Sequence, residues 1–189
     1  ITIQINPLPN IQATDSLDPC AGTEVRLDAS GGVRYQWTGP GGFSSAVANP
    51  VISNINAGQA GLYRVTAASD SGCINRDSTW ITVRPAVNLV VSASQSICEG
   101  DNVQLNAAGG SQYRWEPAAG LSNATIANPI ASPAETTLYT TYASNAAGCT
   151  DTGQVNVTVW KRPVANAGPD LWTINGASIQ LQGSASGSD

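Results

Sequence analysis

Residues 98–115 read CEGDNVQLNAAGGSQYRW, and residues 20–37 read CAGTEVRLDASGGVRYQW. The two stretches lie 78 residues apart and share a cysteine, the apolar positions of two segments, a Gly-Gly pair and a closing Tyr-x-Trp. In each segment apolar and polar residues alternate, which is the period of a strand with one buried face. The Gly-Gly pair between the segments is typical of a tight turn. The chain therefore contains the same predicted pair of strands twice.

The repetition extends along the whole chain. Its landmarks, which recur at a spacing of about 78 residues, are Pro7, Pro85 and Pro163, Ala48-Asn49-Pro50 and Ala127-Asn128-Pro129, Leu62-Tyr63 and Leu138-Tyr139, and Gly72-Cys73 and Gly148-Cys149. We expect two complete repeats, at 8–85 and 86–163. Residues 1–7 read as the last strand of a preceding repeat, and residues 164–189 as the first strands of a further, incomplete repeat.

Composition favours an all-β fold. Glycine is abundant, turn residues separate short alternating segments, and no long segment has a period of 3.6 residues. We predict strands throughout, with helix limited to single turns. Trp37 and Trp115, with Tyr35 and Tyr113 two residues earlier on the same strands, are the expected core anchors.

Charge and residue content exclude several functions. Only 11% of residues are charged, the net charge is −5, and the seven arginines and one lysine are scattered, so we expect no binding of nucleic acid or anionic membranes. The longest apolar runs are strand-sized, which argues against membrane insertion. The sequence has no histidine and no recurring acidic pair. We expect no catalytic site, no metal site, no cofactor and therefore no enzyme.

The four cysteines repeat with the landmarks and lack the C-x-x-C spacing of zinc and redox sites. We expect structural disulfides, which form in an oxidising compartment. The simplest pairing closes each repeat, as Cys20–Cys73 and Cys98–Cys149. A strand of six or seven residues spans roughly 20 Å, however, which is too far for a disulfide between turns at opposite ends of a sandwich. A bond from Cys20 to Cys149, between repeats, is the alternative.

Three tryptophans do not recur in register. Trp80 and Trp160 fall out of phase with the buried faces of their strands, and Trp172 follows a linker. Exposed aromatic rings suit the faces of sugars, so Trp80 and Trp160 are candidate glycan contacts. Packing at the junctions between repeats is the alternative, and we favour it because Trp160 adjoins the linker.

Several stretches resemble a known family. They are CEGDNVQLNAAGG with YRWEPAAGLSNATIANPIASPAETTLYT, then NAAGCTDTGQVNVTV, and finally PVANAGPDLWTINGASIQLQGSASGSD. These residues look like the immunoglobulin-like and polycystic-kidney-disease-type (PKD-like) repeats of surface adhesins of Bacteroidota. The resemblance implies tandem immunoglobulin-like (PKD-like) β-sandwiches in a linear array. It also implies type IX secretion to the outer surface of a Gram-negative bacterium, in adhesins of which some serve gliding motility. Tyr63, with its counterpart Tyr139, resembles the tyrosine corner of such sandwiches.

Two further kinds of site follow from short patterns. Asp15-Ser16-Leu17 and Asp77-Ser78-Thr79 resemble the O-glycosylation triplet of exported Bacteroidota proteins, which makes Ser16 and Ser78 candidate modified residues. Calcium needs several converging oxygens. The loop aspartates that would supply them form no recognisable ligand sequence, so a linker-bound Ca²⁺ stays an alternative to the expected absence of cofactors; they are Asp18, Asp70, Asp101, Asp151 and Asp170.

The expected function is that of a structural and adhesive stalk segment in a large extracellular protein. Its expected partners are neighbouring repeats and, through them, glycans or other surface proteins. Strand edges left unpaired in Ile1 to Asn6 and after Val164 suggest homo-assembly by strand addition. The alternative function is that of a carbohydrate-binding accessory module in a secreted polysaccharide-degrading enzyme. Loss of sugar binding on replacement of Trp80 or Trp160 would favour it.

Overall fold

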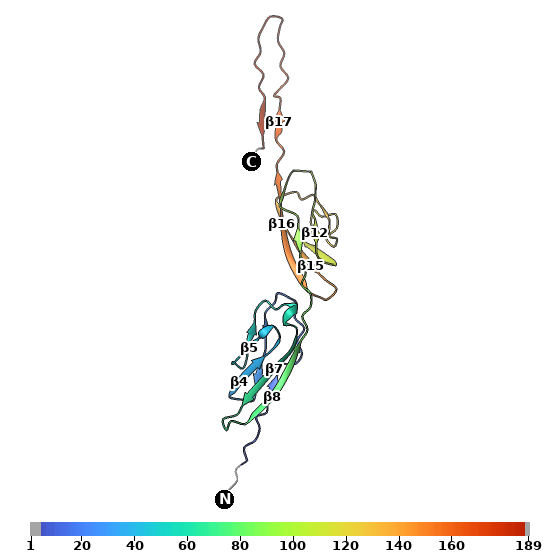
Figure 1. Ribbon diagram of the computed structural model, residues 1–189. Helices are drawn as coiled ribbons and strands as arrows, with labels where there is room; N and C mark the ends of the chain where they lie inside the picture. The colour runs from blue at the N-terminus through green and yellow to red at the C-terminus, as the bar shows by residue number, and fades with distance from the viewer. Residues whose placement is uncertain (1–4, 188–189) are drawn as a thin grey trace. The chain divides into compact units, whose positions relative to one another are not determined.

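The computed structural model describes residues 5–187, and they form an all-β chain, as predicted. Within these residues helix is limited to two single 3₁₀ turns, η1 (Pro40–Gly42) and η2 (Ala57–Gln59). No helix in the described part of the chain is long and apolar enough to cross a bilayer. The chain divides into two compact units (Figure 1). Unit 1 comprises Ile1–Ala86 together with the turn Ala146–Cys149, and unit 2 comprises Val87–Asn145 with Thr150–Asp189.

Unit 1 is a sandwich of two antiparallel layers. One layer is a four-stranded sheet in the order β5-β4-β7-β8, and the other consists of the pairs β1-β3 and β2-β6. The strands of the unit are β1 (Gln12–Ala13), β2 (Val25–Arg26), β3 (Ala29–Ser30), β4 (Arg34–Thr38), β5 (Ser44–Ser45), β6 (Val51–Ile52), β7 (Gly61–Ala68) and β8 (Ile74–Ile81). Leu17 and Cys20 extend the four-stranded sheet through parallel bridges to Ile81 and Arg84. One N-terminal segment thus pairs with both layers.

Unit 2 repeats this plan with local differences. Its four-stranded sheet has the order β10-β16-β15-β13, and β9-β12 and β11-β14 form the facing layer. Its strands are β9 (Val90–Val91), β10 (Gln95–Cys98), β11 (Val103–Gln104), β12 (Ala107–Ala108), β13 (Gln112–Glu116), β14 (Ile130–Ala131), β15 (Thr137–Ser144) and β16 (Thr150–Trp160). The parallel bridges of unit 1 have become the regular parallel strand β10. No strand in the described part of unit 2 corresponds to β5, and Leu121 instead bridges to Ala131 in the facing layer.

The recurring Ala-Asn-Pro landmark holds the facing layer together. In unit 1 the amides of Leu27 and Ala29 donate to the carbonyls of Pro50 and Ala48, at 2.9 and 3.1 Å. In unit 2 the corresponding donors and acceptors are Leu105 with Pro129 and Ala107 with Ala127, both at 2.9 Å. Proline lacks an amide but keeps its carbonyl, so it can accept a sheet hydrogen bond at this place.

Strands were expected at both ends of the chain, and the described residues contain them only at the C-terminal end. Ile1 to Gln4 of the strand predicted in residues 1–7 lie outside the described residues, and Ile5 to Pro7 have no regular structure. After the linker, β17 (Val164–Asn166) pairs with β18 (Ser184–Ser186) in antiparallel register. Asn166 faces Ser184 in this pair. Both strands are exposed along their length, and the further, incomplete repeat at 164–189 stays a prediction.

Both cores are built from the two layers of their own unit. In unit 1 the fully buried side chains come from the facing layer, such as Leu27, and from the four-stranded sheet, such as Trp37, Tyr63, Val65 and Ile81. Unit 2 buries Leu105, Trp115, Tyr139, Val155 and Val157 in the corresponding way. Burial of these aromatic and aliphatic side chains is the main stabilising term of each sandwich.

One core position differs chemically between the units. Trp37 pairs with Val65 across β4 and β7, whereas Trp115 pairs with Thr141 across β13 and β15. The Thr141 hydroxyl is buried and has no hydrogen-bond partner. Replacing it by a valine methyl group keeps the shape and removes an unsatisfied polar atom. We therefore expect Thr141→Val to raise the free energy of unfolding of unit 2 by about 1 kcal/mol.

Calorimetry of the intact chain measures this effect. The expected rise in the melting temperature of unit 2 is about 4 °C or more for a sandwich of this size. Thr79→Val is the matched control, because the buried Thr79 hydroxyl donates to the Asp15 carbonyl at 2.8 Å. That variant should lose stability. A lower melting temperature for Thr141→Val would show that the hydroxyl has a role that its surroundings do not reveal.

Candidate functional site

The strand order places each predicted core anchor on the central strands. Trp37 and Trp115 lie in β4 and β13 with at most 1% of their surface exposed. Their indole nitrogens donate to the carbonyls of Ala48 and Ile126, at 3.1 and 3.0 Å. Each tryptophan therefore fills the core and also ties β4 or β13 to the connection that follows it.

Tyr35 and Tyr113 have a different place from the tryptophans. Both are half-buried, and each hydroxyl bonds to the amide and the carbonyl of one glycine of the Gly-Gly turn. Tyr35 bonds Gly32 at 3.0 and 2.7 Å, and Tyr113 bonds Gly110 at 2.9 Å in both directions. These tyrosines close the turn that leads into the tryptophan strand.

Tyr63 and Tyr139 are buried at equivalent places but bond differently. The Tyr63 hydroxyl donates at 2.8 Å to the carbonyl of Gln59, four residues earlier in η2, which is the tyrosine-corner geometry. The Tyr139 hydroxyl instead donates at 2.9 Å to Ala119, in the loop after β13. Burial raises the pKa of both side chains above the ordinary value of a tyrosine.

This pKa shift predicts how Tyr63 affects stability with pH. At neutral pH, Tyr63→Phe should cost about 1 kcal/mol through loss of the bond to Gln59. The free tyrosine ionises near pH 10. Because the folded pKa is higher, the unfolded chain loses its proton first, and stability declines as the pH rises from the unfolded to the folded pKa. Urea unfolding at pH 7 and near pH 11 should therefore show a smaller alkaline loss in the variant. An identical alkaline loss in both proteins would refute this role of Tyr63.

The cysteines pair across the repeats rather than within them. Cys20 is bonded to Cys149, with 5.8 Å between the Cα atoms and a sequence separation of 129. Cys73 and Cys98 are free. The pairing Cys20–Cys73 and Cys98–Cys149 is therefore wrong, and the alternative is correct. The reason is the one raised by strand length: Cys20 precedes β2, whereas Cys73 follows β7, and these turns lie at opposite ends of one sandwich.

Arg84 holds both chain segments that carry the disulfide. Its Nη1 donates to the carbonyl of Ala147 at 2.7 Å, and its Nε donates to the carbonyl of Asp18 at 2.8 Å. Its backbone amide and carbonyl bond Pro19 and Ala21, both at 2.8 Å. The turn Ala146–Cys149 is thus fixed in unit 1 by one covalent bond and one charge-assisted hydrogen bond.

Sequence reasoning missed Arg84, although a signal for it was present. An arginine precedes the linker proline in both repeats, as Arg84-Pro85 and Arg162-Pro163. In the structure the Arg162 Nε donates at 2.6 Å to the carbonyl of Glu99, one residue after Cys98, whereas the Arg84 Nε donates to the carbonyl of Asp18, two residues before Cys20. Arg162 also pairs with Asp101. The recurrence of Arg-Pro beside the cysteine segment marks a structural cation.

The candidate glycan contacts lie on the outer faces of the sheets. Trp80 exposes 54% of its surface at the end of β8, and Trp160 exposes 52% at the end of β16. Trp172 is 91% exposed. The candidate O-glycosylation sites Ser16 and Ser78 are exposed as well. The structure brings none of these residues into the disulfide site.

The loop aspartates named as calcium candidates are spread over both units. Asp18 pairs with Arg84, Asp101 pairs with Arg162, and an Asp151 carboxylate oxygen accepts from the Leu89 amide at 3.3 Å. Among residues 5–187 no three His, Cys, Asp or Glu side chains gather as metal ligands would. Linker-bound calcium stays a prediction.

The arrangement of strands and anchors defines the class of the fold. Each unit has a buried tryptophan on a central strand of the larger sheet, and the N-terminal segment of each unit pairs with both layers. Unit 1 adds the Tyr63 corner. These features make the units immunoglobulin-like β-sandwiches, as the resemblance implied.

Comparison with known proteins finds solved structures of low similarity to this chain. No family model and no curated protein matches the chain. Similar solved structures include the insect immune protein hemolin, at 13% identity over 81% of this chain and 46% of that chain, with a TM-score of 0.44. The Ig domains of Down Syndrome Cell Adhesion Molecule are 20% identical over 96% of this chain and 32% of theirs, with a TM-score of 0.40. Murine CEACAM1b is 10% identical over 78% of this chain and 100% of its own, with a TM-score of 0.35. Likeness this distant says nothing about binding.

Proposed function

We propose that this chain is a structural and adhesive stalk segment of a large extracellular protein, which spaces and presents a binding region carried elsewhere. The observation that carries the proposal is the Cys20–Cys149 bond. It fixes a turn that belongs by sequence to the second repeat, Ala146–Cys149, into the compact unit of the first. The limits proposed for the repeats are those of the sequence, 8–85 and 86–163.

The bond changes how the chain carries tension. Force applied at the two ends runs along the backbone to Cys20, crosses the disulfide and leaves through Cys149. The 129-residue interval between the cysteines is thereby relieved of load. Trp37 and Trp115 lie in this interval, whereas Ile11 and the β16 residues Val155 and Val157 lie on the loaded path. Such a path suits a stalk that must keep its length under pulling.

The remaining properties of the proposal follow from the chemistry of the chain. A structural disulfide persists in oxidising, extracellular surroundings. Export by the type IX route and display on a Gram-negative cell, including the gliding adhesins, are carried by the sequence resemblance alone. We propose a non-enzymatic protein that works without a cofactor, with neighbouring repeats as its first partners.

A second candidate function is favoured by the two half-exposed tryptophans. Trp80 lies opposite Leu62 near the end of β8, and Trp160 lies opposite Cys98 at the end of β16, so each presents an exposed aromatic ring at a strand end. Aromatic side chains of this kind can stack on sugars, which supports a carbohydrate-binding accessory module. Their separation into two units gives two weak contacts rather than one pocket.

A binding screen separates the two functions. The intact chain is applied to a glycan array, alone and with a reporter lectin fused at one end. The stalk predicts that only the fused lectin binds and that it keeps its own affinity. Sugar binding by the chain alone, lost in Trp80→Ala or Trp160→Ala and kept in the matched control Trp172→Ala, would overturn the stalk in favour of the accessory module.

A further inference from the structure

Two cysteines in the described part of the chain remain thiols. Cys98 is exposed at the end of β10, and Cys73 is half-buried in the turn between β7 and β8. A single exposed thiol would mean little. The counterparts of both residues, Cys20 and Cys149, are bonded to each other in the same structure.

Cys98 stands in unit 2 where Cys20 stands in unit 1. Cys20 forms a parallel bridge to Arg84, and Cys98 pairs in parallel with Trp160. The next amide donates at 2.8 Å to the carbonyl of that partner in both units. A glycine with positive φ follows two residues after each cysteine, at φ 87° and 84°. The backbone around the Cys98 thiol is therefore the backbone that places Cys20 in its disulfide.

Cys73 stands in its repeat where Cys149 stands in the other. Each follows a glycine of positive φ, Gly72 at 81° and Gly148 at 79°, in the turn between the two longest strands of its unit. The Cys73 sulfur lies 3.8 Å from the carbonyl of Asn6, the residue before Pro7. The Ala147 carbonyl accepts from the guanidinium of Arg84, the residue before Pro85. The turn Ser69–Cys73 thus has the form of the turn Ala146–Cys149, which is bonded to Cys20.

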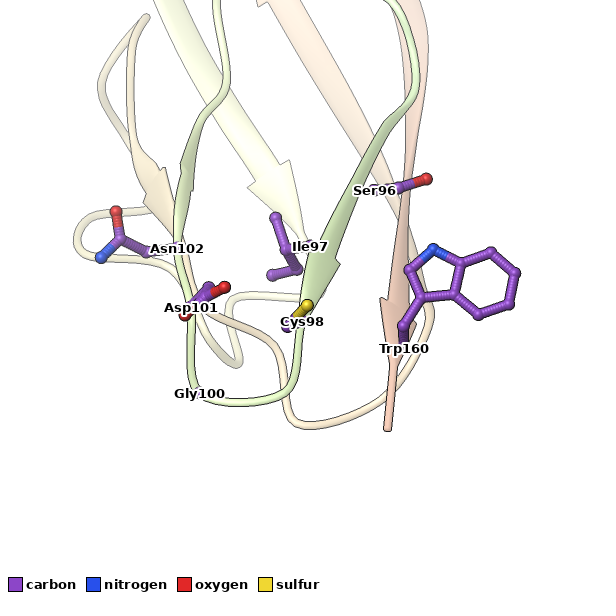
Figure 2. A pocket seen from close by; sticks show the side chains of 7 residues that line it. All are labelled: Ser96, Ile97, Cys98, Gly100, Asp101, Asn102 and Trp160. Carbon is purple, nitrogen blue, oxygen red and sulfur yellow. The ribbon is translucent and has the colours of Figure 1, made fainter. Parts of the chain in front are cut away.

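The surface around Cys98 is open to receive such a turn. Figure 2 shows Cys98 and Trp160 at the ends of neighbouring strands, with Gly100 and Asp101 in the loop beside them. They line a shallow hollow of about 530 Å³. Trp160 has the register position of Arg84, and the hollow lies where unit 1 holds the turn Ala146–Cys149.

We propose that Cys98 and Cys73 are the two halves of a further bond of the Cys20–Cys149 type, formed between two copies of this chain. Cys98 of one copy forms a disulfide with Cys73 of the next copy, whose Ser69–Cys73 turn packs beside Cys98. Each copy carries one half of each kind, so a single Cys98–Cys73 contact is heterologous and leaves one half at each end of the pair, from which a head-to-tail chain can grow. This inference is independent of the proposed stalk function, because it requires only the two thiols and the bond already present.

The bond forms by thiol–disulfide exchange with a small disulfide such as oxidised glutathione. The Cys98 thiolate attacks one glutathione sulfur, which gives a mixed disulfide and releases one reduced glutathione. The Cys73 thiolate of the second copy then attacks the Cys98 sulfur and releases the other reduced glutathione. Two protein thiols are oxidised, and one glutathione disulfide is reduced to two thiols.

Two single variants test the pairing. Cys73→Ser keeps only the Cys98 half, and Cys98→Ser keeps only the Cys73 half, while both retain the Cys20–Cys149 bond. Each is incubated in a glutathione redox buffer without denaturant, alone and mixed, and resolved on non-reducing gels. We expect the mixture to form a dimer at least about tenfold faster than either variant alone, since access and seating control the exchange. The parent chain should form a ladder of oligomers.

Peptide mapping identifies the bond. In a mixture of ¹⁵N-labelled and unlabelled parent chain, the Cys73–Cys98 peptide should join heavy to light halves. Three results would overturn the proposal: a Cys73–Cys98 bond within one chain, equally fast Cys98–Cys98 dimers of Cys73→Ser, or thiols that end only as glutathione adducts. None of these results bears on the binding screen that tests the stalk function.

Discussion

Trp37→Ala is expected to unfold unit 1 under conditions in which the parent chain is folded. Trp37 is fully buried, and its indole nitrogen is bonded to Ala48. Truncation of a buried tryptophan removes its apolar surface and leaves a cavity, which typically costs about 3–5 kcal/mol. A sandwich of about 78 residues has a total stability at the low end of the usual range of roughly 5–15 kcal/mol. The variant should therefore lose most or all of the stability of unit 1.

Urea unfolding followed by circular dichroism measures this loss, and the chain supplies its own control. Trp80 lies in the same sheet but exposes 54% of its surface. Trp80→Ala removes the same number of atoms, yet we expect a change below about 1 kcal/mol, because surface substitutions have small effects. Equal losses for the two variants would show that Trp37 is not the anchor of the core.

Gly31→Ala is expected to separate β1 from β3. Gly31 has φ 87°, and a Cβ atom on it would lie 1.8 Å from the carbonyl oxygen of Asn10. That oxygen belongs to the backbone and cannot rotate away. The substitution combines a strained left-handed backbone with a main-chain collision, so we expect a loss of about 3 kcal/mol or more. Chemical denaturation and the loss of amide protection at Thr14, whose amide donates to the Asp28 carbonyl at 2.9 Å, would both report it.

Gly72→Ala separates the collision from the backbone strain. Gly72 has nearly the same φ, 81°, but no atom lies within 4 Å of the added Cβ. Only the left-handed penalty of roughly 1–2 kcal/mol should appear. Gly109→Ala repeats the test in unit 2, where the Cβ would lie 2.0 Å from the carbonyl oxygen of Asn88. If Gly31→Ala lowers the free energy of unfolding no more than Gly72→Ala does, a Cβ atom at position 31 does not collide with the Asn10 carbonyl oxygen.

Most of the fold can be predicted from the sequence, because the alternation of apolar and polar residues and the repeat of about 78 residues indicate the same strands. Alternation around Trp37 and Trp115, with a Gly-Gly turn before each, identifies the central strands without any long-range information. The comparison of two copies then shows which positions belong to the core. Side-chain partners are harder to derive. Tyr63 and Tyr139 occupy equivalent positions, yet they bond Gln59 and Ala119 because the connections before them differ in length and path.

The disulfide shows where sequence reasoning stops. Each repeat owns one cysteine of each kind, so counting favours pairing within the repeat. Strand length argues against it, but only the fold shows that the turn Ala146–Cys149 belongs to unit 1. The role of Arg84 is likewise invisible in one copy, since its acceptor Ala147 lies 63 residues away. Contacts between distant turns depend on packing that no local pattern encodes.

The load path through Cys20 and Cys149 is tested most directly by stretching single molecules by their two ends at constant force. With the disulfide intact, only the segments outside the 129-residue interval can lengthen. Adding a reductant during the hold should release that interval in a single covalent step. The extra length is then roughly 450 Å, from about 3.3–3.6 Å per residue. Cys149→Ser should show the full extension without reductant. Equal extension of the parent chain before and after reduction would contradict the account.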